Sequence, residues 1–83
     1  MKILYFAWVR EKTGMGEEDV TLPDGVLDVA GLVKWQRGRN SGYAAAFAAP
    51  ELIRVAVNQT HVGLDHPLTD HDEVAFFPPV TGG

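Results

Sequence analysis

The stretch EVAFFPPVTGG, residues 73 to 83, passes from an apolar segment through two prolines to a terminal Gly-Gly pair. Residues 73–77 are apolar and aromatic, which is typical of a β-strand. Pro78 and Pro79 cannot donate the amide hydrogen bonds of a strand ladder, and they hold the chain extended. The stretch therefore predicts a last strand followed by an extended, flexible tail over residues 78–83.

A first strand of similar character is predicted near the start of the chain. KILYFAWV (2–9) is apolar, aromatic and β-branched with almost no polar alternation, as expected for a strand covered on both faces. The glycine-containing turn REKTGMGEE follows, and DVTLP (19–23) then alternates apolar and polar residues. We expect these two strands to form a hairpin. The shared apolar character of residues 2–9 and 73–77 is compatible with parallel neighbours in one sheet.

Two helices are predicted in the middle of the chain. Apolar residues follow an Asp-Gly turn at helical spacing, at Val29, Leu32 and Val33. Asp28 is a suitable N-cap for this helix, whereas Gln36 falls where the apolar stripe should continue. A second, shorter helix is predicted from an N-cap at Ser41 to just before Pro50.

The remaining elements are strands and connections. LIRVAVN (52–58) alternates as a strand, Asn58-Gln59 marks a turn, and residues 60–72 have the composition of irregular connections with room for one short strand. The order of elements predicts a single α+β domain over residues 1–83. We expect a mixed sheet of about four or five strands with a helix packed across one face.

Composition and charge exclude several classes of function. The formal charge is −4, from seven Lys and Arg against eleven Asp and Glu, and the basic residues are scattered, which argues against nucleic-acid binding. No apolar stretch is long enough to span a membrane, and the start carries no cleavage site, so we expect a cytoplasmic protein. Cysteine is absent, which excludes disulfides, thiolate metal sites and cysteine nucleophiles. The spacing of His61, His66 and His71 fits neither a helix face nor a strand face, so we expect no metal site.

The tail has features that suit a reactive terminal carboxylate. Gly82 and Gly83 have no side chains, so they fit a channel as narrow as the backbone, and Val80 and Thr81 could occupy a partner's groove. A carboxylate reacts only after activation, for instance as an acyl-adenylate made with ATP. The chain has no phosphate-binding loop of the P-loop or dinucleotide type. The activating enzyme must therefore be a separate protein.

Three stretches resemble one family over essentially the whole chain. VAVNQTHVGLDHPLTDHDEVAFFPPVTGG (55–83), FAWVREKTG (6–14) and LPDGVLDVAGLVKWQRGR (22–39) resemble the small subunit of molybdopterin synthase, a ubiquitin-like sulfur carrier. The uninterrupted DEVAFFPPVTGG is the most specific of these motifs. The resemblance implies a β-grasp (ubiquitin-like) fold, which agrees with the predicted order of elements.

The resemblance also implies a mechanism with several partners. An adenylating (E1-like) enzyme would activate Gly83 with ATP, and a sulfurtransferase or cysteine desulfurase system would convert it to a thiocarboxylate. The tail would insert into the large synthase subunit, where the sulfur passes to cyclic pyranopterin monophosphate to form the molybdopterin dithiolene. The inserted residues would be Pro78, Pro79, Val80, Thr81 and Gly82. The chain would be a cosubstrate within a heterotetramer, without a catalytic side chain, a permanently bound cofactor or a metal of its own.

A partner interface is implied as well. Phe76 and Phe77 point to opposite faces of their strand. Phe77 is favoured as the anchor for the large subunit, with Phe6 beside it. His61 and Arg10 are further interface candidates, although solvation is the default for an exposed charge such as Arg10.

The sequence departs from the family pattern at Gln36, His61 and His71. An apolar residue is common at the first two positions, and a turn glycine at the third, where histidine tolerates a positive φ better than most residues. Other functions remain open from the sequence. They are a sulfur carrier for thiamine or another thio-compound, a ubiquitin-like modifier that forms isopeptide bonds through Gly83, and an interaction module with an idle tail.

Overall fold

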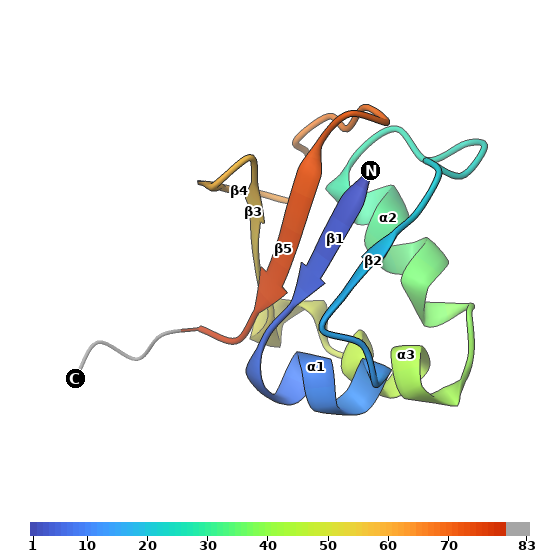
Figure 1. Cartoon of the computed structure of the whole chain (residues 1–83), viewed down its shortest axis with the longest axis vertical. Coiled ribbons are helices and arrows are strands. Elements are labelled where there is room, and N and C mark those ends of the chain that lie inside the picture. Colours follow the sequence, from blue (N-terminus) through green and yellow to red (C-terminus); the bar gives the residue numbers. More distant parts are fainter. Residues whose placement is uncertain (80–83) are drawn as a thin grey trace.

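The computed structural model describes residues 1–79, and Figure 1 shows a mixed sheet with helices on one side of it. The strands are β1 (Lys2–Tyr5), β2 (Glu17–Asp19), β3 (Arg54–Val57), β4 (Thr60–Val62) and β5 (Glu73–Phe77). The helices are α1 (Ala7–Thr13), α2 (Val29–Arg37) and α3 (Ser41–Ala46), with a 3-10 helix at Pro50–Leu52.

The sheet has the strand order β2-β1-β5-β3-β4. β1 and β5 run parallel in the centre, and the other neighbours are antiparallel. Ile3 pairs with Val74 and Tyr5 with Phe76, so the two central strands end at the same edge of the sheet. This five-stranded mixed sheet with helices across one face confirms the predicted α+β, β-grasp fold.

The first strand is shorter than the sequence predicts. β1 ends at Tyr5 instead of at residue 9, and α1 begins at Ala7. The apolar residues beyond Tyr5 belong to this helix, in which Val9 is fully buried against the core. The chain turns out of the sheet at Ala7, whose φ is 53°.

The predicted hairpin is wrong, because α1 separates its two strands. β2 covers Glu17–Asp19 instead of residues 19–23, and it still pairs antiparallel with β1. Val20 and Leu22 lie beyond the end of β2, partly buried against the core. The Val20 amide still donates to the Met1 carbonyl at 2.9 Å, and the alternation of Val20 and Leu22 reflects their packing against the core beyond the end of β2.

The helix starts follow cap chemistry. Asp28 caps α2 as predicted, because its carboxylate accepts a hydrogen bond from the Gly31 amide at 2.8 Å. For α3 the cap is Asn40, whose side chain accepts from the Tyr43 amide at 3.1 Å, so the predicted cap, Ser41, is instead the first helical residue. α3 also stops at Ala46, well before the predicted end at Pro50.

The second half of the chain agrees better with prediction. β3 covers four residues of the predicted 52–58 strand, and β5 has the predicted bounds. Asn58 and Gln59, with φ of 51° and 70°, form the predicted turn, since a two-residue hairpin favours positive φ. Among residues 1–79 the remaining non-glycine positive φ belongs to Ala7. His71 lies in a turn in which the Asp72 amide donates to the Thr69 carbonyl at 3.2 Å, so the turn is kept with a negative φ at His71.

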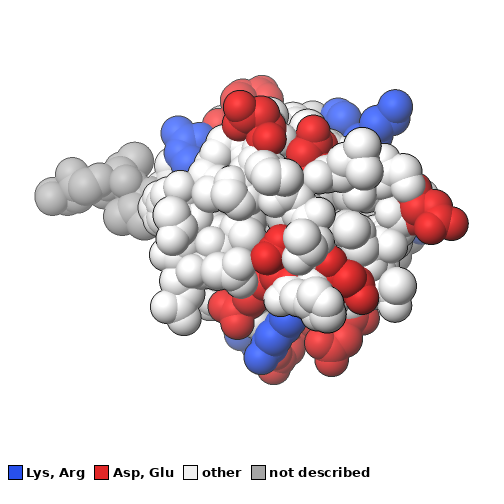
Figure 2. Space-filling view, turned by 90° about the horizontal axis from the view of Figure 1, so that it is seen from above, with Lys and Arg blue, Asp and Glu red and all other residues white. Residues whose placement is uncertain are grey.

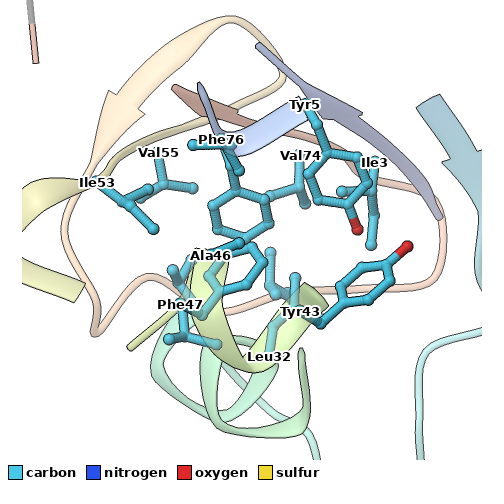
Figure 3. Close-up of a cluster of buried hydrophobic side chains, with 14 of the residues drawn as sticks. Ile3, Tyr5, Leu32, Tyr43, Ala46, Phe47, Ile53, Val55, Val74 and Phe76 are labelled. Carbon is cyan, nitrogen blue, oxygen red and sulfur yellow. The ribbon is translucent and has the colours of Figure 1, made fainter. Parts of the chain in front are cut away.

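Phe76 occupies the centre of the core. It has no exposed surface, its ring stacks on Tyr5 with centroids 6.1 Å apart, and it meets Phe47 edge-on at 4.9 Å. Figure 3 shows Phe76 pointing from the sheet toward Phe47 and Ala46 of the helical layer. Because successive side chains of a strand point to opposite faces, Phe77 points to the sheet face away from the helices.

A polar network closes one side of this core. The buried Gln36 donates to the Tyr5 hydroxyl at 2.6 Å, and that hydroxyl donates to Glu18 at 2.7 Å. Arg39 donates to Gln36 at 2.9 Å and to Glu18 at 3.1 Å, and Tyr43 donates to Glu18 at 3.0 Å. Figure 3 shows the Tyr5 and Tyr43 hydroxyls close together on this side. Edge strand β2 is thereby tied to α2 and α3.

Candidate functional site

The candidate site begins where β1 and β5 end side by side (Figure 1). Phe77 is the last strand residue, followed by the half-buried Pro78 and the exposed Pro79. The other predicted tail residues, Val80, Thr81, Gly82 and Gly83, lie outside the described residues. Their proposed chemistry stays a prediction.

Phe77 lies on the sheet face that turns away from the helices. Strand alternation places it opposite the fully buried Phe76, and its own side chain is half-buried. Its ring centroid lies 5.2 Å from that of His61 on β4, and its register partner on β3 is Arg54. The structure therefore brings together two of the predicted interface residues, Phe77 and His61.

Phe6 reaches the same edge of the sheet from β1. Its amide donates to the Phe76 carbonyl at 3.1 Å, and its side chain is 48% exposed. Because Tyr5 points into the core, alternation turns Phe6 to the face that carries Phe77. We refer to Phe6, His61 and Phe77 as the tail-base surface.

The tail-base surface continues into a strip of apolar side chains. Leu4, Ala75 and Ala56 are register neighbours across β1, β5 and β3 on the same face. Within residues 1–79 no helix covers this face (Figure 1). This strip is not apparent from the sequence, because alanine carries little signal, although the alternation of β5 places Ala75 on the face of Phe77.

Arg10 lies elsewhere. It is exposed on α1, and its guanidinium is close to Gly16, where an added Cβ would lie 3.3 Å from Arg10 Cζ. The Gly16 carbonyl accepts from the Tyr5 amide at 2.9 Å, so Arg10 lies on the β2 side of β1, away from β5. Arg10 is therefore not part of the tail-base surface, and its role in a partner interface stays a prediction.

Within residues 1–79 no three His, Asp or Glu side chains are placed to hold a metal ion. In the same range no helix is long and apolar enough to cross a bilayer. A hollow of about 460 Å³ lies along α2 between Asp24 and Arg39, but Arg39 is already paired with Glu18 there. The exposed aromatic side chains of the tail-base surface suit docking of a partner on the open sheet face.

Known proteins similar to this chain share its full length. The ThiS family model matches residues 3–83. The molybdopterin synthase sulfur carrier subunit of Escherichia coli (strain K12) is 45% identical over 83 residues, covering 100% of this chain and 99% of that protein. The subunit of the same name from Haemophilus influenzae is 34% identical, with the same coverage.

Two solved structures are also similar to this chain over nearly its whole length. A Pyrococcus furiosus protein, provisionally named molybdopterin converting factor, subunit 1, has a TM-score of 0.69 and 28% identity, covering 95% of each chain. SAMP1 of Haloferax volcanii has a TM-score of 0.66 and 26% identity, covering 100% of this chain and 98% of its own. Since the family model spans nearly all of the sequence, the protein belongs to the ThiS family.

Proposed function

We propose that the protein is the sulfur carrier subunit of a molybdopterin synthase, acting in the cytoplasm. The observation that carries this proposal is the 45% identity to the Escherichia coli subunit over all 83 residues. The open sheet face supports it, because a carrier has to present its terminus to other proteins. Phe77 lies on that face directly before the tail.

The reactive group in this proposal is the Gly83 carboxylate. In a partner adenylating enzyme, a carboxylate oxygen attacks the α-phosphorus of ATP and pyrophosphate leaves. The terminal sulfur of a sulfurtransferase persulfide then attacks the acyl-adenylate and displaces AMP, and a thiol reductant cleaves the resulting acyl disulfide to leave the thiocarboxylate. In the large subunit this sulfur passes to cyclic pyranopterin monophosphate. ATP is thus used by the partner, and this chain needs no permanent cofactor.

The tail-base surface is proposed as the docking site for the large subunit. Phe77 supplies an aromatic anchor, with the His61 ring beside it and Phe6 exposed at the end of β1. Aromatic side chains carry much of the binding energy of protein interfaces. Pro78 and Pro79 restrict the chain directly after the anchor, so less conformational entropy is lost when the tail inserts.

Reconstitution from purified components tests this function. The chain, the adenylating enzyme, ATP, a sulfur donor, the large subunit and the pterin precursor are combined, and molybdopterin is quantified. We expect the wild-type chain to support synthesis, and a chain without Gly82 and Gly83 to fold normally but support none. Molybdopterin formation by the truncated chain would contradict the proposal.

A second candidate, a protein modifier, is supported by one specific similarity. SAMP1 of Haloferax volcanii, whose name expands to small archaeal modifier protein 1, is 26% identical over the whole chain. A modifier would use the same activated Gly83 but transfer it to a lysine amine. Mass spectrometry of cellular proteins for peptides that carry Gly83 on a lysine tests this candidate, and their absence would remove it.

A further inference from the structure

Ala7 has a backbone conformation that is unusual for its residue type. Its φ of 53° lies in the left-handed region, which residues with a Cβ adopt rarely. The other two such residues within residues 1–79, Asn58 and Gln59, form a hairpin turn that requires positive φ. Ala7 is in no hairpin, because it joins β1 directly to α1. Such outliers are informative when the surrounding structure holds them in place.

Hydrogen bonds on both sides hold this conformation. The Phe6 amide donates to the Phe76 carbonyl at 3.1 Å, which continues the sheet by one residue. The Phe6 carbonyl accepts from the amides of Val9 at 3.2 Å and Arg10 at 3.4 Å, which starts the helix. Ala7 is therefore the point at which the chain turns from the sheet into α1 while Phe6 keeps bonds to both.

The turn at Ala7 determines what stands beside the tail. A strand that continued through residue 9, as the sequence pattern predicts, would run on past the end of β5, next to Pro78 and Pro79. The turn into α1 removes that strand from the base of the tail. It leaves Phe6 as the last extended residue, with φ of −126° and ψ of 153°, and with its ring exposed on the face of Phe77.

We propose that Ala7 is a positioning residue whose left-handed backbone fixes the exposed Phe6 beside Phe77, so that the tail-base surface is formed before a partner binds. This inference rests on the proposed function. Glycine would adopt the same φ without strain, but it populates both signs of φ, and the orientation of Phe6 would be less restricted. A surface that is ordered in advance loses less entropy on binding.

The substitution Ala7→Gly separates positioning from stability. We expect its thermal midpoint to equal or exceed that of the wild type, because the left-handed strain is relieved. We expect its affinity for the large subunit, measured by calorimetry, to fall by about 2- to 10-fold, the range set by ordering one more side chain at an interface. If Ala7 had only a structural role, Ala7→Gly would lower the thermal midpoint and leave the affinity for the large subunit unchanged.

Two matched variants control this result. Gly14 lies at the other end of α1 with φ of 78° and open space around an added Cβ. Gly14→Ala should therefore lower the thermal midpoint by backbone strain and leave the affinity unchanged. Asparagine tolerates the left-handed region and keeps a Cβ, so Ala7→Asn should retain wild-type affinity. Loss of affinity in Ala7→Asn equal to that in Ala7→Gly would overturn the inference.

A double-mutant cycle with Phe6→Ala identifies the route of the effect. If Ala7 acts through Phe6, Ala7→Gly weakens binding in the wild-type background and has no further effect once Phe6 is alanine. Equal losses in both backgrounds, or wild-type affinity of Ala7→Gly, would overturn the inference while the proposed function stands.

Relaxation of the Phe6 ring in the free protein, measured by NMR, gives a test that needs no partner. We expect greater mobility of Phe6 in Ala7→Gly and no change at Phe77. If the wild-type chain shows no affinity for the large subunit, the proposed function fails, and the Phe6 relaxation still decides whether Ala7 fixes that ring. Unchanged mobility of Phe6 would overturn the inference.

Discussion

At the scale of single residues, Gln36 shows how a polar side chain can hold a core position. From the sequence it interrupts the apolar stripe of α2, yet it has no exposed surface. Its amide nitrogen donates to Tyr5 and its amide oxygen accepts from Arg39, so neither end is left without a partner. The pattern of apolar residues could not reveal this, because Tyr5 lies 31 residues away in the sequence, although Arg39 follows Gln36 by only three residues.

The network makes Gln36 sensitive to substitution. Gln36→Leu is expected to lower the free energy of unfolding by about 1–3 kcal/mol, because Tyr5 and Arg39 each lose a hydrogen-bond partner in a largely closed site. Arg37→Gln, an exposed change on the same helix, should stay within about 0.5 kcal/mol of the wild type. Urea unfolding measures both, and a Gln36→Leu midpoint at or above the wild-type value would contradict the expectation.

Phe77 is the residue on which the docking proposal depends most. Phe77→Ala should weaken binding of the large subunit by about 30-fold, as expected for a central aromatic anchor. Its effect on the free energy of unfolding should stay within about 1 kcal/mol, because the ring is only partly buried. Leu27→Ala is the control, since Leu27 is 76% exposed on the connection into α2 and is not part of the tail-base surface. Calorimetric affinities that fall equally for both variants would contradict a docking role for Phe77.

At the scale of elements, the predictions succeeded where local chemistry is strong. The bounds of β5 follow from its apolar run and from Pro78-Pro79, and the start of α2 follows from the cap at Asp28. The predicted 2–9 strand is wrong because its apolar residues serve two elements, β1 and α1, with no glycine or proline at the boundary. For the site, alternation separated Phe76 from Phe77, but the contact between Phe77 and His61 depends on the pairing of distant strands.

The packing of α3 on α1 depends on Gly42. A Cβ at Gly42 would lie 2.5 Å from the Lys12 carbonyl oxygen, so the backbones approach too closely for alanine. Gly42→Ala is expected to lower the free energy of unfolding by about 1–3 kcal/mol through this overlap. Gly38→Ala is a matched control, because its nearest atom would be 3.6 Å away and its φ is −86°, and it should be neutral or stabilising by up to about 1 kcal/mol. Thermal unfolding that ranks Gly38→Ala below Gly42→Ala would contradict this reading.

At the scale of the whole molecule, acidic residues outnumber basic ones by eleven to seven. Figure 2 looks onto the end opposite the tail base, where acidic side chains outnumber basic ones. Two carboxylates of this end are strong hydrogen-bond acceptors: Asp70 accepts from the Leu22 amide at 2.7 Å and Asp72 from the Thr69 amide at 2.8 Å. These bonds hold the pKa of both carboxyls below the usual value.

Together with Asp70 and Asp72, the carboxylate of Glu18 makes the stability of the fold depend on pH. Burial opposes the ionisation of Glu18, but the hydrogen bonds from Arg39, Tyr5 and Tyr43 outweigh it and lower its pKa. A carboxyl with a lowered folded-state pKa stabilises the fold above its unfolded pKa, so the protein should lose stability as the pH falls from the unfolded carboxyl pKa, about 4, through the lower folded-state pKa. Glu18→Gln should be less stable at neutral pH and lose less on acidification. An equally steep loss in this variant, measured by urea unfolding across the range, would contradict the assignment.

The central claim is that Gly83 carries sulfur, and one measurement tests it most directly. The protein is taken from the cells that express it, treated with a thiol alkylator, and searched for adducts by tandem mass spectrometry. Fragment ions are needed, because replacing oxygen by sulfur adds about 16 mass units, nominally the same as oxidation of Met1 or Met15. The chain has no cysteine, so an adduct on Gly83 is the predicted result and identifies a thiocarboxylate. No adduct on Gly83, even after incubation with ATP, the adenylating enzyme and a sulfur donor, would contradict sulfur carriage by this protein.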